Sequence, residues 1–390
     1  MKILYVVSRP LEINTSASIR NRATILGLVD NGHEVEVLTT EPDRNHPAFD
    51  GQMSVDDVAR MHYVKLGGSQ RIARMGRKVA FLRPIKDLAY RWMTRHEVYD
   101  NLKGIITHTD AISLQNAQYD LIISSSDPKS SHLFVYELLQ QQRSGFKGRW
   151  IQIWGDPFAS DITFKADSKR KKVRHEEHKL LKCADKIVYV SPLTLRDQKV
   201  AYPDCADKMF DCPIPYEHEV IYEINPVRER STVNLLYCGD YISRVRDIMP
   251  LYDAAQEATR VHLTICGDCD NPVESCENVT VYPRVPHAEV IQKEREADIL
   301  VHLSNRHGSQ IPGKIYQLAA TNKPILFILD GASDQLLSVF GKYERFVFAQ
   351  NQKESIAEAV QKMIAEYGLV EYAPVKGFSR KAIAASIIQN

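Results

Sequence analysis

Short runs of β-branched and other apolar residues alternate with helix-length amphipathic stretches throughout this chain of 390 residues. In the first half the runs lie at 2–7, 34–39, 119–124, 150–154 and 186–191. The pattern begins again in the second half, with runs at 233–238, 262–266, 279–282, 298–302 and 324–329. Strands that alternate with helices build parallel sheets with helices on both faces. The sequence therefore predicts an α/β protein.

The restart of the pattern in the second half predicts two Rossmann-like domains. Pro213 and Pro215 precede it and stiffen an extended connector where helix is disfavoured. The predicted parts are a first domain at 1–212, a second at 213–375 and a C-terminal helix at 376–390. One arrangement open to this helix is to cross back to the first domain. Parallel sheets bind ligands at the carboxyl ends of their strands, so we expect the two domains to face each other across a binding cleft.

The composition excludes several classes of protein. Lys plus Arg number 50 and Asp plus Glu number 49, and a net charge of +1 provides no general field to gather nucleic acid. The apolar run at the N-terminus is too short for a signal peptide, and no segment is apolar enough to span a bilayer. Seven scattered cysteines favour reduced thiols in the cytoplasm. No nucleophile elbow, Walker loop or dinucleotide fingerprint occurs in the sequence.

The sharpest local signal is Pro312-Gly313-Lys314, which follows an apolar strand. Pro312 suits the first turn of a helix, and Gly313 lets an anion approach the free amides there. Lys314 at this end opposes the helix macrodipole by about 0.3–1 kcal/mol, and an anionic ligand would relieve the conflict. A surface lysine that begins an ordinary amphipathic helix is the alternative.

Residues 312–326, Pro-Gly-Lys-Ile-Tyr-Gln-Leu-Ala-Ala-Thr-Asn-Lys-Pro-Ile-Leu, resemble the donor-site segment of glycosyltransferase family 4, especially its bacterial capsule and O-antigen members. Shorter pieces in the family's order and spacing lie at 32–39, 184–191, 236–240 and 263–268. The resemblance implies the two-domain GT-B fold. It also implies a nucleotide-activated sugar as donor, retention of its anomeric configuration and no metal or other cofactor.

By this resemblance, Lys314 and an arginine after Gly239 would hold the diphosphate, whose developing charge needs compensation in the transition state. Arg244 and Arg246 are the candidates, and Arg246 fits the spacing better; exposed loop charges are the alternative for both. Gly267 would make the second glycine turn of the donor site.

The sequence departs from the family at two positions. Many members carry two glutamates with seven residues between them, and here those positions hold Ser309 and Gln317. Gln317 retains the hydrogen-bonding groups for a ribose diol, although it is equally a solvated helix residue. Ser309 supplies no charge, so the carboxylate contact to the donor sugar does not carry over.

The first domain is expected to hold the acceptor. Ser16 and Ser18 are small residues near a predicted helix start, and Arg20 lies in its first turn. Asp156 follows a strand and is the best placed carboxylate to orient the acceptor hydroxyl or accept its proton. Asp127 ends another strand and is a second candidate for this role. Ordinary helix caps and an ordinary arginine are the alternatives.

Two basic runs lie in the first domain. Residues 69–103 contain nine basic and three acidic residues, and 165–182 contain eight and three. Basic stretches with aromatic residues favour an anionic membrane surface, whereas a solvated helix face is the alternative. No nucleic-acid motif accompanies them, and the spacing of Cys266, Cys269 and Cys276 fits zinc poorly.

Together these features predict a retaining glycosyltransferase that moves a sugar from a nucleotide diphosphate to a lipid-linked or polysaccharide acceptor. It would act in bacterial surface glycan synthesis, as a peripheral protein at the inner face of the cell membrane. Two alternatives remain open at this stage. One is a non-catalytic GT-B scaffold that binds nucleotide or glycan, and the other is a sugar-nucleotide epimerase.

Overall fold

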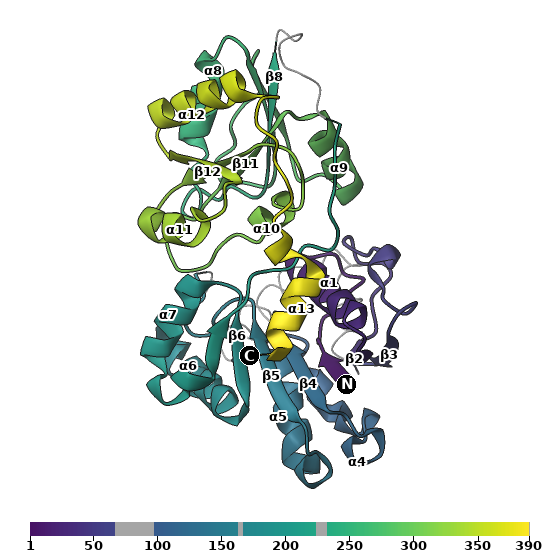
Figure 1. Ribbon diagram of the computed structural model, residues 1–390. Coiled ribbons are helices and arrows are strands. Elements are labelled where there is room, and N and C mark those ends of the chain that lie inside the picture. The colour runs from purple at the N-terminus through teal and green to yellow at the C-terminus, as the bar shows by residue number, and fades with distance from the viewer. Residues whose placement is uncertain (67–96, 163–166, 224–231, 390) are drawn as a thin grey trace, which may run out of the picture. The chain divides into compact units, whose positions relative to one another are not determined.

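The computed structural model describes residues 1–66, 97–162, 167–223 and 232–389 (Figure 1). The chain forms two compact units. Unit 1 comprises Met1–Glu217 together with Arg380–Asn390, and unit 2 comprises His218–Ser379. The chain passes between the units a few residues beyond the predicted positions 212 and 375. Within the described ranges, no helix is long and apolar enough to cross a membrane.

Unit 1 contains a seven-stranded parallel sheet in the order β3-β2-β1-β4-β5-β6-β7. Its strands are β1 Lys2–Val6, β2 Glu34–Thr40, β3 Arg60–Val64, β4 Leu121–Ser125, β5 Arg149–Trp154, β6 Lys186–Tyr189 and β7 Met209–Asp211. Its main helices are α1 Ser16–Asp30, α5 Ser130–Gln142, α6 Asp167–Cys183, α7 Pro192–Ala201 and α13 Arg380–Gln389, with a short α4 Leu114–Ala117. Short 3₁₀ turns are η1 Gly51–Met53, η3 Lys103–Ala111, η4 Arg143–Gly145 and η5 Pro203–Lys208.

Both faces of this sheet are buried, as the near-continuous apolar strands predict. Successive residues of a strand point to opposite faces. Leu4 and Val6 of β1 accordingly join one apolar core with residues of α5 and α6. Ile3 and Tyr5 join another with residues of α1 and α13.

Unit 2 contains a six-stranded parallel sheet in the order β10-β9-β8-β11-β12-β13. Its strands are β8 Val233–Cys238, β9 Val261–Cys266, β10 Val279–Tyr282, β11 Ile299–Leu303, β12 Ile325–Leu329 and β13 Phe346–Gln350. Its helices are α8 Met249–Glu257, α9 His287–Glu296, α10 Lys314–Leu318, α11 Ser333–Phe340 and α12 Lys353–Glu366, with a 3₁₀ turn, η7 Lys376–Phe378.

The predicted α/β class with two Rossmann-like sheets is confirmed, and ten of the thirteen strands β1–β13 lie where the apolar runs place them. The three strands that the sequence missed, β3, β7 and β13, lie at sheet edges. β3 is largely exposed and β7 has only three residues, so neither has the apolar run that marks a central strand. In each sheet the strand order reverses beside the first strand, β1 or β8, and ligands bind at such a switch point.

The C-terminal helix does return to the first sheet's unit, because α13 packs against α1 (Figure 1). Gly27 of α1 permits the close approach, since a Cβ atom there would clash with the carbonyl group of Arg380. Arg380 also pairs with Asp30 at 2.7 Å, and the Asn31 side chain donates to the Lys381 carbonyl at 2.9 Å. These contacts join the end of the chain to its first helix.

Gly27→Ala is expected to destabilise unit 1 by about 1–3 kcal/mol, because the added methyl group overpacks the contact between α1 and α13. Chemical denaturation measures the free energy of unfolding. Gly377→Ala is the matched control, since a Cβ atom there would meet nothing within 4 Å. Equal stability of the two variants would show that the contact with α13 does not depend on this glycine.

Candidate functional site

Two glycine turns lie side by side at the carboxyl edge of the sheet in unit 2. Gly239 follows β8 and Gly267 follows β9. A Cβ atom on Gly267 would clash with the carbonyl group of Gly239, so the two turns pack backbone against backbone. The Gly239 N–H donates to the Cys266 carbonyl at 2.9 Å. This packing explains why glycine follows β9.

Arg246 is bonded into this edge. Its Nη1 donates to the Asp240 carbonyl at 2.8 Å, and its Nε donates to Asn305 Oδ1 at 3.0 Å. Asn305 is buried in the loop after β11 and donates in turn to the Gln310 carbonyl at 2.9 Å. Arg246 therefore joins the loop after β8 to the loop after β11, whereas Arg244 on the same segment is exposed.

Lys314 begins α10, and its amine is not turned out to solvent. Its Nζ donates to Glu294 Oε1 of α9 at 2.7 Å, and 30% of its side chain is exposed. Burial disfavours the charged amine, but the Glu294 carboxylate and then the Cys238 thiol outweigh it, so the pKa of Lys314 is raised. Lys314 is therefore a charged group beside the end of β8.

The predicted conflict between Lys314 and a helix macrodipole needs correction. The helix α10 has only five residues, so its aligned dipoles are few. The carboxylate of Glu294 already compensates the ammonium within the protein. An anion is therefore not required for this local structure to form. An ammonium has three donors, and the bond to Glu294 uses one of them.

Lys314 and Arg246 lie at the same strand end from different sides. Tyr237 and Cys238 are successive residues of β8 and point to opposite faces. Arg246 and the Tyr237 hydroxyl both donate to the Asp240 carbonyl, while the charge of Lys314 acts on the Cys238 thiol. Arg246 therefore lies beside Gly239, with its Nη1 4.0 Å from the position of a Cβ atom there, and Lys314 lies near the preceding residue, Cys238.

Three further residues predicted for the donor site lie near Lys314 in the chain. Gly313 directly precedes α10, Ser309 lies in the loop after β11, and Gln317 lies on α10; all three are half-buried. Sequence reasoning missed two carboxylates at this end of unit 2. They are Glu294, bonded to Lys314, and Asp240, which pairs with Arg284.

Unit 1 brings three predicted residues together at the carboxyl edge of its sheet. Arg20 is buried, with 6% exposed, and donates to the Ser126 carbonyl just after β4. A Cβ atom on Gly155, which precedes Asp156, would clash with the Arg20 guanidinium. Burial opposes ionisation of Asp127, but the charges of Lys129 and Arg20 and a hydrogen bond with Asp156 prevail, so the pKa of Asp127 is lowered.

Lys129 is the cation of this group that the sequence did not indicate. Its buried amine pairs with Asp127. Burial disfavours its charge, yet the carboxylates of Asp127 and Asp156 raise the pKa of Lys129 overall. Two carboxylates and two cations thus lie together after β4 and β5.

The two serines near the start of α1 differ in exposure. Ser16 is exposed, whereas Ser18 is 2% exposed and its hydroxyl donates to the Ile13 carbonyl at 2.6 Å. Thr15 caps α1 by accepting from the Ser18 N–H at 3.2 Å. The Ser18 hydroxyl is therefore bonded to the loop before α1, and the cap of this helix is Thr15.

Glu177 on α6 holds the loop that carries Asp156. This fully buried carboxylate accepts from the backbone N–H groups of Phe158 at 2.8 Å and Ala159 at 2.9 Å, and from the Tyr202 hydroxyl at 2.7 Å. The sequence does not indicate this role, because the pattern of a strongly basic helix predicts that its glutamates are exposed.

The cysteines of unit 2 form no three-ligand group in the part of the chain that the structure describes. There, the group of three potential metal ligands lies in unit 1 and consists of His178, Asp204 and Cys205. Its His178 Nε2 lies 2.9 and 2.8 Å from the two Asp204 carboxylate oxygens, as in an ordinary ion pair.

Solved structures match this chain along its whole length, whereas no family model and no curated protein matches it. It is similar to HepE of Anabaena, solved with UDP and glucose, with a TM-score of 0.56, 11% identity and coverage of 100% of this chain and 96% of HepE. The lipopolysaccharide outer core galactosyltransferase WaaB has a TM-score of 0.55 and 13% identity, with coverage of 100% and 98%.

The chain has the GT-B fold. A UDP-N-acetylglucosamine 2-epimerase is also similar, with a TM-score of 0.54, 10% identity and coverage of 100% of this chain and 94% of the epimerase. At these identities the likeness establishes the architecture. The side chains decide the chemistry, since one fold hosts several activities.

Glu177→Gln is expected to lower the free energy of unfolding by about 1–3 kcal/mol, because the amide cannot accept all three hydrogen bonds and a buried donor loses its partner. Glu176→Gln is the neighbouring control, because glutamine still offers an acceptor to the Tyr99 hydroxyl at that half-buried position. Chemical denaturation of both variants measures the difference. Equal unfolding curves would contradict the anchoring role of Glu177.

Proposed function

We propose that the protein is a glycosyltransferase that moves a sugar from a nucleotide diphosphate to a hydroxyl group of an acceptor, with retention of anomeric configuration. The observation that carries this proposal is that two cations lie at the end of β8, Arg246 beside Gly239 and Lys314 near Cys238. When the bond between the anomeric carbon and the diphosphate breaks, negative charge develops on the leaving oxygen. Two fixed cations at this place would stabilise it.

Each candidate residue at the donor site of unit 2 has a proposed role. Arg246 suits bidentate contact with phosphate oxygens, and Lys314 acts as a point charge. Gly267 makes room for the backbone of Gly239, and the phosphates are proposed to lie beside the turn at Gly239, next to Arg246. Gln317 would hydrogen-bond the ribose. We expect no metal, because the two side chains supply the positive charge that the leaving group requires.

Unit 1 is proposed to hold the acceptor. Asp156 would orient the acceptor hydroxyl and accept its proton as the acceptor oxygen bonds to the anomeric carbon. Asp127 is hydrogen-bonded to this side chain, and the charge of Lys129 acts on it, so both lie next to the proposed acceptor position. Ser16, exposed at the start of α1, is left for contact with the acceptor.

A lipid-linked or polysaccharide acceptor and a role in bacterial surface glycan synthesis remain part of the proposal. The similarity to WaaB and to HepE supports it at the level of the fold. A scaffold without activity would bind UDP and turn over no donor with any acceptor. An epimerase would release an altered sugar without an acceptor, so analysis of the products separates the three functions.

Lys314→Ala is expected to weaken the binding of UDP by more than about tenfold, or 1.4 kcal/mol, because a cation next to the diphosphate is lost. Isothermal titration calorimetry measures the dissociation constant. Lys342→Ala, an exposed lysine beyond α11, is the charge-matched control and should bind as the parent does. An unchanged dissociation constant for Lys314→Ala would remove the donor site from this end of unit 2.

Binding to an anionic membrane surface is also proposed. Most of the basic run 69–103 lies outside the described residues, as does the beginning of the run 165–182. The remainder of the second run is in α6, where Arg170, Lys171, Lys172, Arg174 and Lys182 are exposed. Each basic residue near an anionic surface contributes about 1 kcal/mol.

Replacing Arg170, Lys171 and Lys172 together by Gln should therefore reduce sedimentation with phosphatidylglycerol vesicles by about tenfold or more. A second variant neutralises the basic residues within 71–91. Phosphatidylcholine vesicles are the control and should bind neither the parent nor the variants. If both variants bind anionic vesicles as well as the parent, the membrane proposal is wrong.

A further inference from the structure

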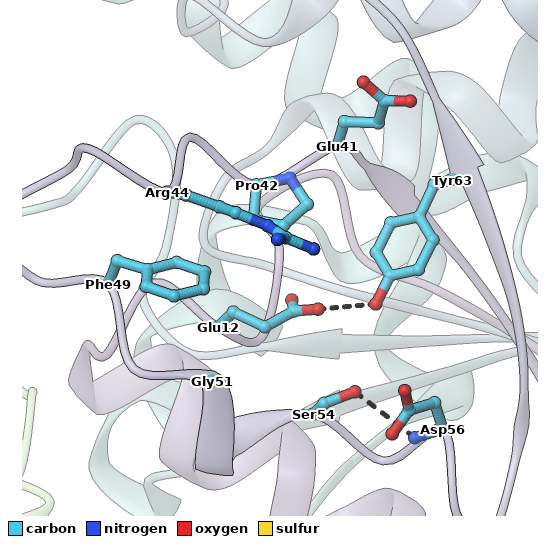
Figure 2. Close-up of a pocket in the computed structure, with 9 residues that line it drawn as sticks. All are labelled: Glu12, Glu41, Pro42, Arg44, Phe49, Gly51, Ser54, Asp56 and Tyr63. Carbon is cyan, nitrogen blue, oxygen red and sulfur yellow. Dashed lines mark hydrogen bonds between the residues drawn. The ribbon is translucent and has the colours of Figure 1, made fainter.

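A cavity of about 470 Å³ opens in unit 1, and its lining contains none of the residues assigned above (Figure 2). It lies where the chain leaves β1, β2 and β3, at the carboxyl edge of the sheet. Its lining residues are Glu12, Glu41, Pro42, Arg44, Phe49, Gly51, Ser54, Asp56 and Tyr63. This volume is within the range of about 300–1,000 Å³ that is usual for small-molecule sites.

Glu12 is the unusual member of this lining. It is 5% exposed, and one carboxylate oxygen accepts from the Tyr63 hydroxyl. The other oxygen, Oε2, is buried without a hydrogen-bond partner among the described residues. Figure 2 shows the carboxylate between Phe49, Arg44 and Tyr63. Because an unpaired buried carboxylate oxygen is costly, a ligand that donates a hydrogen bond would stabilise this arrangement.

The backbone holds Glu12 and Phe49 side by side before any ligand binds. The Asp50 N–H donates to the Glu12 carbonyl at 2.7 Å, and the Asn14 N–H donates to the Ala48 carbonyl at 2.8 Å. Ile13 and Phe49 form an antiparallel bridge between these bonds. The Ser18 hydroxyl fixes the same segment through the Ile13 carbonyl. The cavity is therefore preorganised.

The charges of the lining restrict the ligand. The lining contains three carboxylates, from Glu12, Glu41 and Asp56, and one guanidinium, from Arg44. Glu41 has a partner outside the lining, Lys65, at 3.3 Å. The excess of carboxylates disfavours phosphates and carboxylated sugars. It favours hydroxyl and ammonium groups, which donate to carboxylates.

The shape of the lining adds a second restriction. The rings of Phe49 and Tyr63 stand on two sides of Glu12 in Figure 2 and present apolar faces beside a carboxylate. A sugar ring combines an apolar C–H face with hydroxyl groups at its rim. Burial and the Glu12 carboxylate raise the pKa of Tyr63, so its hydroxyl stays protonated and continues to donate to Glu12.

We propose that this cavity binds a sugar unit that carries no negative charge, with a hydroxyl or ammonium group of the sugar at Glu12 Oε2 and the ring against Phe49. In the transferase this unit would belong to the acceptor glycan. The assignment of this sugar unit to the acceptor rests on the proposed function. The class of ligand does not, because it follows from the lining of the cavity.

Saturation-transfer difference NMR on the full chain tests the proposal with three probes at equal concentration: methyl glucoside, glucosamine and glucuronate. Methyl glucoside and glucosamine are expected to bind, with glucuronate at least about fivefold weaker because of charge repulsion. Equal or stronger binding of glucuronate would overturn the assignment.

Two variants locate the binding. Glu12→Gln retains the size of the side chain and an acceptor for the Tyr63 hydroxyl. It should reduce the affinity for glucosamine about tenfold, so that the affinities for glucosamine and glucuronate become more similar. Phe49→Ala removes the stacking surface and should weaken the binding of methyl glucoside and of glucosamine, each by about tenfold. Asp57→Asn, exposed and outside the lining, is the control and should bind as the parent does. Thermal denaturation shows whether each variant is folded.

The cavity is not the site if Phe49→Ala and Glu12→Gln, both folded, bind the sugars as tightly as the parent. UDP titration separates this failure from that of the transferase. Sugar binding without UDP binding supports the sugar site in the cavity and contradicts the proposed transferase function. UDP binding without sugar binding supports the proposed function and contradicts the sugar site.

Discussion

The parallel direction of the strand pairs in both sheets is the constraint on which both candidate sites depend. In a parallel sheet each strand is followed by a crossover, so segments that are far apart in the chain leave the sheet at the same edge. Arg246 follows β8 and Asn305 follows β11, and these neighbouring strands bring the two side chains into contact. Likewise, Asp127 follows β4 and Asp156 follows β5.

The charges gathered at these edges are mostly compensated within the protein. Lys314 pairs with Glu294, and Lys129 pairs with Asp127. Such pairs hold long side chains in fixed positions, which is the preorganisation that binding and catalysis require. A diphosphate at Lys314 would share the ammonium with Glu294. Glu12 differs from these groups, because one oxygen of its buried carboxylate has no hydrogen-bond partner among the described residues. This unpaired oxygen is the reason for proposing a ligand there.

Local pattern predicted the elements of the fold well. Central strands such as β1 and β4 are buried on both faces and therefore read as apolar runs, whereas the edge strand β3 is largely exposed and does not. The glycines after β8 and β9 do follow the ends of these strands, and Gly267 is needed for the backbone contact between the two loops. The roles of Glu177 and Glu294 were not visible, because each acts on a group in a different element.

The sequence by itself determined the α/β class, the two sheets and the residue types that stand at the strand ends, because hydrophobic periodicity and turn chemistry are local properties of the chain. Only the tertiary structure decided which polar groups meet. Glu177 bonds to Tyr202, and Arg20 bonds to the carbonyl group of Ser126. The hydrophobic effect that drives folding is non-directional, so pairing between distant side chains is set by strand order and crossover path rather than by any neighbouring residue.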